Sequence, residues 1–181
     1  MKKRSKINKK DTKRGKFMKK YILRVIFLII IILISSIIFG FSAQDGEESG
    51  GLSKKVVLIV ADIFNIENDN IEKFIEIGEP IVRKLAHFGI YTILGIASMA
   101  FMVTFNISKV KQIITTILWG IVYASTDEFH QTFIDGRNGS ILDVLLDTSG
   151  VIFGIAIVLF TIYLYSRYKN NKKEKTNEVK S

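Results

Sequence analysis

The chain has 181 residues, of which 48 % are hydrophobic, and a formal net charge of +9 at pH 7. This length fits one domain, and the absence of cysteine excludes disulfides, thiolate nucleophiles and cysteine-based metal sites. Most of the Lys and Arg lie in residues 1–20 and 167–180, whereas the residues between are largely apolar. A basic tail beside a hydrophobic segment is typical of a cytoplasmic flank on anionic lipid, so we expect no nucleic-acid partner.

Four segments are long and apolar enough to cross a bilayer, which takes about 20 residues with a rise of about 1.5 Å each. They are residues 21–41, 85–105, 112–129 and 141–165. We therefore predict an all-α membrane protein with a bundle of four transmembrane helices. A signal peptide is the rival interpretation of 21–41, and the letters FSAQ resemble a cleavage site. We expect a retained span, because its apolar core is longer than that of a signal peptide.

Residues 42–80 are too many for a simple connection between two spans. The stretches KKVVLIVADIF and NIEKFIEIG carry apolar residues at helical spacing. They predict short amphipathic helices that lie on the outer membrane surface between the first and second spans. Pro80 is the only proline, and it suits the first turn of the second span.

The orientation follows from the distribution of Lys and Arg in the loops. Both terminal tails and the 106–111 loop are basic, whereas 42–80 is acidic on balance and 130–140 is nearly neutral. This pattern predicts a multi-pass protein with both termini in the cytoplasm and two loops outside.

With this topology, the polar ends of all four spans meet on the outer side. Ionisable groups at bilayer depth are costly, so the default interpretation of such groups is functional. Residues three or four apart share a helix face, and these spacings predict a shallow polar cleft that is open to the outside. Its candidate residues are Ser42, Gln44, Arg83, Lys84, His87, Tyr91, Tyr123, Asp127, Glu128, His130, Gln131, Arg137, Asp143 and Asp147.

Small residues accompany these polar faces. Gly120 and Ala124 are four residues apart in the third span, and Gly150 and Gly154 are four apart in the fourth. Such spacings favour close helix approach in membranes. Ser140 and Asp143 fit the S-x-x-D capping pattern, which predicts that Ser140 caps the fourth span.

Three interpretations of the charged residues remain open. In a binding site, Arg83, Lys84 and Arg137 recognise an anion. In a catalytic site, a histidine acts as general base and a carboxylate orients it, the candidates being His87, His130 and Asp127. In an architectural network, ion pairs hold the helix ends together, and the buried Asp147 pairs with a cation from Arg83, Arg137 or His130.

Metal binding is a separate question, because two His and several carboxylates are present. Neither a His-x-x-x-His nor a His-Glu-x-x-His motif occurs, and no pattern fixes three zinc ligands. We therefore predict no metal and no other cofactor.

Three stretches occur in the order FSAQDGEESGGLS, RKLAHFGIYTILG and YASTDEFHQTFIDGRNGSILDVLLDTSG. Together they resemble the VanZ-like family of bacterial membrane proteins, over about residues 25–165. The resemblance implies a protein of the bacterial cell membrane with a VanZ-like transmembrane domain at 21–165 between basic cytoplasmic tails at 1–20 and 166–181. Founding members of the family are associated with low-level resistance to the glycopeptide teicoplanin, and the family's biochemical activity is unsettled.

The leading hypothesis is an envelope protein whose outward-facing cleft binds an anionic or glycan-linked surface lipid, such as a cell-wall or lipoteichoic-type lipid. Binding of this lipid would alter glycopeptide access. The alternatives are an intramembrane hydrolase or transferase acting on a lipid-linked envelope substrate, and an ion-pair network without a ligand. We favour binding over catalysis. The sequence leaves the oligomeric state open.

Overall fold

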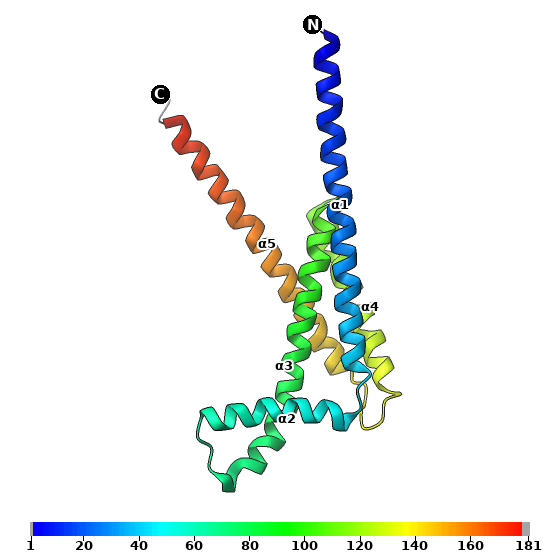
Figure 1. Cartoon of the computed structure of the whole chain (residues 1–181), viewed down its shortest axis with the longest axis vertical. Helices are drawn as coiled ribbons and strands as arrows, with labels where there is room; N and C mark the ends of the chain where they lie inside the picture. The colour runs from blue at the N-terminus through cyan, green and yellow to red at the C-terminus, as the bar shows by residue number, and fades with distance from the viewer. Residues whose placement is uncertain (1, 179–181) are drawn as a thin grey trace.

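The computed structural model describes residues 2–178, and these form five helices without any strand, as predicted for the all-α class. In chain order they are α1 (Lys2–Ser42), α2 (Gly46–Ile63), α3 (Asn68–Val103), α4 (Lys109–Gln131) and α5 (Ile141–Glu178). Figure 1 shows the two ends of the chain at the same end of the molecule, with α2 lying across the opposite end.

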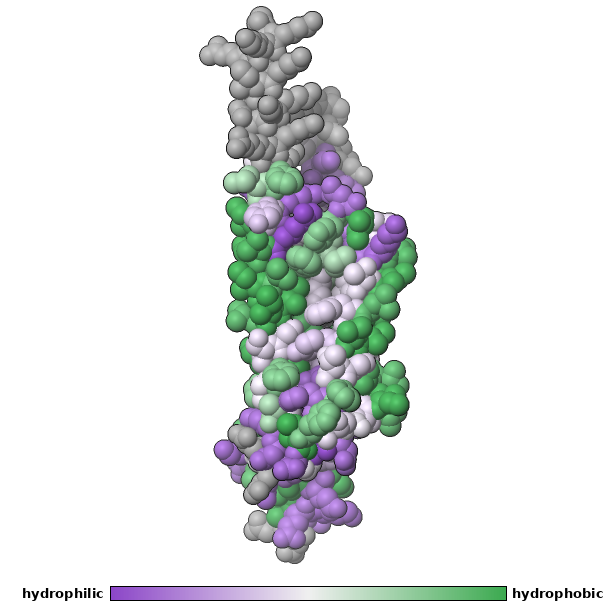
Figure 2. Space-filling view, turned by 90° about the vertical axis from the view of Figure 1, so that its right-hand side faces the viewer, coloured by the Kyte–Doolittle hydropathy of each residue, from purple (hydrophilic) through white to green (hydrophobic). Residues whose placement is uncertain are grey.

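Within the described residues, three helical segments are long and apolar enough to cross a membrane. They are Phe17–Ser42, Asn70–Val103 and Ile141–Lys173. The predicted span 112–129 lies in α4, which carries Asp127 and Glu128 near its end and is not among the three. Many large apolar side chains of these helices are exposed, and Figure 2 shows hydrophobic surface around the middle of the molecule and hydrophilic surface gathered at its lower end. This surface fits a membrane protein.

The two amphipathic stretches between the first spans fold differently from each other. KKVVLIVADIF lies in α2, but NIEKFIEIG forms the first part of α3, which continues through Pro80 to Val103. The prediction that Pro80 lies in the first turn of a span is therefore wrong. A proline inside a helix removes one backbone hydrogen bond and crowds the preceding turn, which bends the helix, and Figure 1 shows this bend where α3 passes α2.

The core lies between α3, α4 and α5, and α1 covers one side of it. Its largest fully buried side chains include Tyr91, Leu94, Met99 and Val151. The backbones of α3 and α5 are in direct contact, because a Cβ on Gly150 would lie 2.6 Å from Phe88 O, and one on Gly154 would collide with Thr92 O. The small-residue spacing in the fourth predicted span thus marks a true helix contact.

The basic end of the first span is attached to the turn between α3 and α4. Arg24 Nε donates to Thr104 Oγ1 at 3.1 Å, and its guanidinium lies 4.0 Å from the centre of the Phe105 ring. Lys20 Nζ donates to Asn106 Oδ1 at 2.8 Å. These contacts tie α1 to the turn between α3 and α4.

Replacement of Gly154 by Ala tests the α3–α5 contact. The added methyl group must push apart two packed backbones, so we expect a loss of about 1–3 kcal/mol in the free energy of unfolding. The thermal unfolding midpoint of the protein in detergent measures this loss. Gly40→Ala is the matched control, because nothing lies within 4 Å of a Cβ at Gly40 and Ala is the better helix former. Equal midpoints for the two variants would contradict the contact.

Candidate functional site

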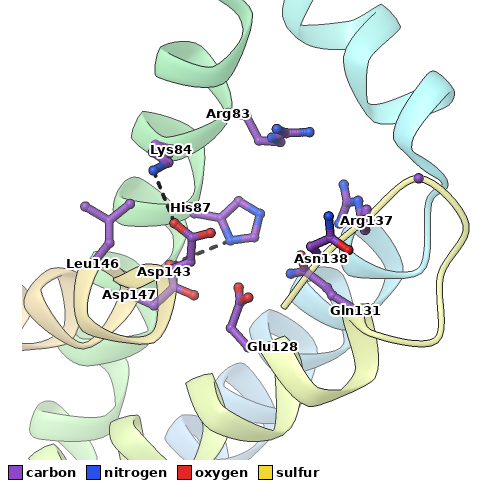
Figure 3. Close-up of a pocket in the computed structure, with 11 residues that line it drawn as sticks. Arg83, Lys84, His87, Glu128, Gln131, Arg137, Asn138, Asp143, Leu146 and Asp147 are labelled. Atoms are coloured by element: carbon purple, nitrogen blue, oxygen red, sulfur yellow. Dashed lines mark ion pairs between the residues drawn. The ribbon is translucent and has the colours of Figure 1, made fainter. Parts of the chain in front are cut away.

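A pocket of about 220 Å³ lies where the middle of α3, the end of α4 and the start of α5 meet the α4–α5 loop. Most of its lining residues belong to the predicted cleft, and Figure 3 shows their side chains converging on one space. We call it the polar pocket; it is lined by Arg83, Lys84, His87, Glu128, Gln131, Gly136, Arg137, Asn138, Asp143, Leu146 and Asp147.

The loop that closes the polar pocket is held by short-range contacts. Glu128 Oε2 accepts a hydrogen bond from Ser140 N at 2.9 Å, which ties the end of α4 to the start of α5. Ser140 Oγ accepts from Leu142 N at 3.2 Å, so the predicted capping role of Ser140 is confirmed. Gly136 has a φ of 73°, a left-handed conformation that favours glycine. Gly46 N donates to Asp135 O at 3.1 Å, which places the α1–α2 turn against this loop.

Three cations surround the polar pocket. Lys84 Nζ lies 3.4 Å from Asp143 Oδ1, an exposed pair that contributes little stability. Arg137 Nη1 donates to Ser42 O at 3.2 Å, and its buried Nε has no hydrogen-bond partner. Burial and the nearby Arg83 lower the pKa of Arg137 from its usual value, although an arginine of this kind stays charged at neutral pH.

Three residues that line the polar pocket, His87, Glu128 and Asp147, lie close to Asp127, which does not line it. His87, Asp127, Glu128 and Asp147 each offer one ligand atom, and these atoms lie within 4.8 Å of one another. We call these four residues the His87 cluster. His87 Nδ1 lies 3.6 Å from Asp147 Oδ1, so the partner of Asp147 is His87 rather than the cation that the sequence predicts. The close approach of α3 and α5 brings this pair together.

Asp127 is contacted by a side chain of the hydrophobic core. Its Oδ2 accepts a hydrogen bond from Tyr91 Oη at 3.1 Å, while its Oδ1 is buried without a partner. Tyr91 itself is fully buried and does not line the polar pocket. Tyr91 therefore does not contact the polar pocket as predicted; its hydroxyl positions Asp127 instead.

The structure separates His130 and Tyr123 from the polar pocket. The His130 ring stacks on Phe39 of α1 with centroids 4.4 Å apart, and its Nδ1 is buried without a hydrogen-bond partner. Tyr123 Oη donates to Ser35 O at 2.6 Å, also on α1. Both side chains bind α4 to α1, so of the two histidines only His87 faces the polar pocket.

A second hollow of about 190 Å³, which we call the apolar groove, lies between α1, α2 and α3. No pattern in the sequence indicated this groove, because its walls come from apolar faces that also suit ordinary helix packing. Gln44 belongs to this groove, and Ser42 lies beside it through its contact with Arg137. The groove is lined by Ile38, Phe41, Gln44, Ser49, Leu52, Ser53, Arg83, Ala86, His87, Ile90 and Arg137.

The sequence also missed three further residues of the polar pocket. Gly136, Asn138 and Leu146 line it beside Arg137 and Asp147. Asn138 had a usable signal, because it follows Arg137 directly in the GRNGS loop. Leu146 had none, since an apolar residue in an apolar span indicates only packing or lipid contact.

These features define a helical membrane protein whose polar side chains meet between helix ends. The VanZ/LLP1 family model matches residues 27–163, and the chain therefore belongs to the VanZ/LLP1 family. The resemblance noted from the three sequence stretches is confirmed. Comparison with curated proteins gives no match, and comparison with solved structures gives none either.

Replacement of Tyr91 by Phe tests the support of Asp127. The variant keeps the ring but leaves the buried carboxylate without its donor, so we expect a loss of about 1–3 kcal/mol in the free energy of unfolding. Tyr165→Phe is the control, because Tyr165 is 67 % exposed. Thermal unfolding in detergent compares the two. A Tyr91→Phe protein as stable as the control would show that the hydrogen bond contributes nothing.

Proposed function

We propose that this protein binds an anionic or glycan-linked lipid of the bacterial cell envelope. The polar pocket takes the headgroup, and the apolar groove takes part of the hydrocarbon chain. The observation that supports this proposal is that the two hollows share Arg83, His87 and Arg137. An amphiphile with a charged head and an apolar tail matches such a pair of adjoining hollows.

The chemistry of the shared residues favours an anion. Arg83 and Arg137 carry guanidinium groups, whose planar donors suit phosphate and carboxylate oxygens. Arg137 keeps a buried Nε without a partner, and such a donor gains more from a ligand than an exposed one. Gln131 and Asn138 add neutral amides that suit the hydroxyl groups of a sugar.

We propose that α4 is a fourth span and that both termini lie in the cytoplasm. The basic residues at the two ends of the chain support this orientation, as does the position of both termini at one end of the molecule (Figure 1). The polar pocket then faces the outside, and α2 lies on the outer surface. The transmembrane domain is 21–165, and 1–20 and 166–181 are its cytoplasmic tails.

In this arrangement the bound lipid alters the access of glycopeptides to the outer envelope. That is how the protein would contribute to low-level teicoplanin resistance of the VanZ type. The effect requires binding at the outer leaflet and does not require turnover of the lipid.

Arg137→Gln tests the headgroup site. Loss of one charge-assisted contact of about 1.5–3 kcal/mol weakens binding by about 10- to 100-fold. Mass spectrometry of lipids that co-purify in mild detergent measures the loss, and the teicoplanin inhibitory concentration of expressing cells measures its effect. Arg167→Gln, in the last predicted tail, is the matched control.

Ala86→Phe separates the tail site from the headgroup site. The aromatic ring fills the apolar groove but removes no charge, so we expect loss of long-chain lipids with Arg137 intact. If Arg137→Gln and Ala86→Phe change the stability of the protein but leave the co-purified lipids unchanged, the architectural alternative is favoured and lipid binding is contradicted.

A hydrolase or transferase is the second candidate, because His87 faces the polar pocket and lies 3.6 Å from Asp147. An imidazole oriented by a carboxylate is a suitable general base. Incubation of the purified protein with envelope lipid extract distinguishes the two functions. Catalysis requires a new lipid or headgroup product that disappears in His87→Gln, whereas binding leaves the extract chemically unchanged.

The proposed topology is testable without background labelling, because the chain contains no cysteine. In intact cells, a membrane-impermeant maleimide is expected to label Asn138→Cys at the α4–α5 loop. Lys109→Cys at the start of α4 is expected to react only after permeabilisation. Equal labelling of the two positions in intact cells would contradict an outward-facing pocket.

A further inference from the structure

We infer that the His87 cluster is a binding site for a divalent metal cation. Its ligand atoms come from three helices, with His87 on α3, Asp127 and Glu128 on α4, and Asp147 on α5. All four atoms lie within 4.8 Å of one another. Ligands bonded at about 2.0–2.4 Å lie roughly 2.8–4.8 Å apart around one ion, so the spacing of the four atoms is within the range for a shared ion.

The unsatisfied atoms of the cluster provide independent support. Asp147 Oδ2 and Asp127 Oδ1 are buried without a hydrogen-bond partner, and Asp147 Oδ1 has only the His87 contact at 3.6 Å. Asp147 is 0 % exposed and Asp127 is 3 % exposed, so bulk water does not reach them freely. Buried carboxylates of this kind are normally paired or coordinate a metal. Figure 3 shows Glu128 and Asp147 directed toward the same point as the His87 ring.

The charge of the cluster also calls for a cation. Three carboxylates face one imidazole, and the nearest lysine, Lys84, is paired with Asp143 outside the cluster. Arg137 is directed to the Ser42 carbonyl. A divalent ion offsets two of the three negative charges.

The donor set indicates which ions fit. Three oxygen ligands with one imidazole nitrogen suit Mn²⁺ or Zn²⁺, whereas Mg²⁺ and Ca²⁺ prefer oxygen alone. His87, Glu128 and Asp147 also line the polar pocket, so an ion enters from there and one side of it faces the pocket. The sequence did not predict this site because its ligands are distributed over three helices and form no local motif.

Metal binding is measured on the full-length protein, purified in detergent through a tag without histidine and stripped with a chelator. We expect elemental analysis after incubation with MnCl₂ or ZnSO₄ and desalting to give about one ion per chain. The unfolding midpoint should rise by several degrees. Asp147→Asn and Glu128→Gln should weaken binding at least about tenfold, whereas Asp143→Asn, a pocket residue outside the cluster, should not.

A spectroscopic measurement on the unaltered protein tests the site even where the Asp147 and Glu128 variants fail to fold. Electron spin-echo spectra of bound Mn²⁺ should contain the modulation of a coordinated imidazole nitrogen, and His87→Gln should abolish it while His130→Gln should not. Binding that persists unchanged in Asp147→Asn and Glu128→Gln, an absent nitrogen signal, or no binding of either ion would each overturn the inference. These measurements use lipid-free protein, so their failure leaves the proposed lipid binding untouched, and failure of lipid capture leaves the metal site untouched.

Discussion

The structure depends on the close contact between α3 and α5, because this contact sets Asp147 against His87. Gly150 and Gly154 allow the two backbones to touch, and Asp147 lies on the turn of α5 that precedes them. A buried carboxylate that loses its partner costs about 3–5 kcal/mol. The position of Asp147 is therefore tolerable only where α3 supplies a polar group, and His87 at 3.6 Å is that group. The pairing of Asp147 with His87 therefore depends on the same helix contact that Gly150 and Gly154 allow.

The polar pocket contains charges of both signs. Arg83, Lys84 and Arg137 line it together with Glu128 and Asp147 of the His87 cluster. The two sets of charges suit two ligands of opposite charge in one space, an anionic headgroup beside the cations and a metal ion among the acids. The polar pocket also adjoins the apolar groove through Arg83, His87 and Arg137. Such an arrangement suits an amphiphile better than a free anion.

Much of the fold was predictable from the sequence. The apolar runs gave the helices, and the basic ends gave the expected orientation. Pro80 is one exception, because the amphipathic stretch before it continues α3 instead of ending. The fourth predicted span is another, because α4 is not among the three segments apolar enough to cross a membrane. Propensity rules place proline near helix starts, but packing of α2 on α3, through Val57 against Gly78, holds the bent helix together.

For the site, the sequence predicted the correct end of the molecule but not the individual partners. Helical spacing put His130 and Asp127 on neighbouring positions of one face, yet His130 turns to Phe39 of α1 and Asp127 turns to Tyr91 of α3. The difference is a fraction of a helical turn, which spacing alone does not resolve.

The sequence by itself determined the all-α class and three of the segments that are apolar enough for a bilayer, and it predicted that the acids and bases gather in one place. These properties are local, since they depend on periodicity and on the cost of charge in lipid. The tertiary structure alone decided that His87 rather than His130 faces the pocket, that Asp147 pairs with His87, and that three helices bring four ligand groups within 4.8 Å. The physical reason is that these contacts depend on how the helices rotate and cross, and steric contact between distant residues such as Gly150 and Phe88 sets that geometry.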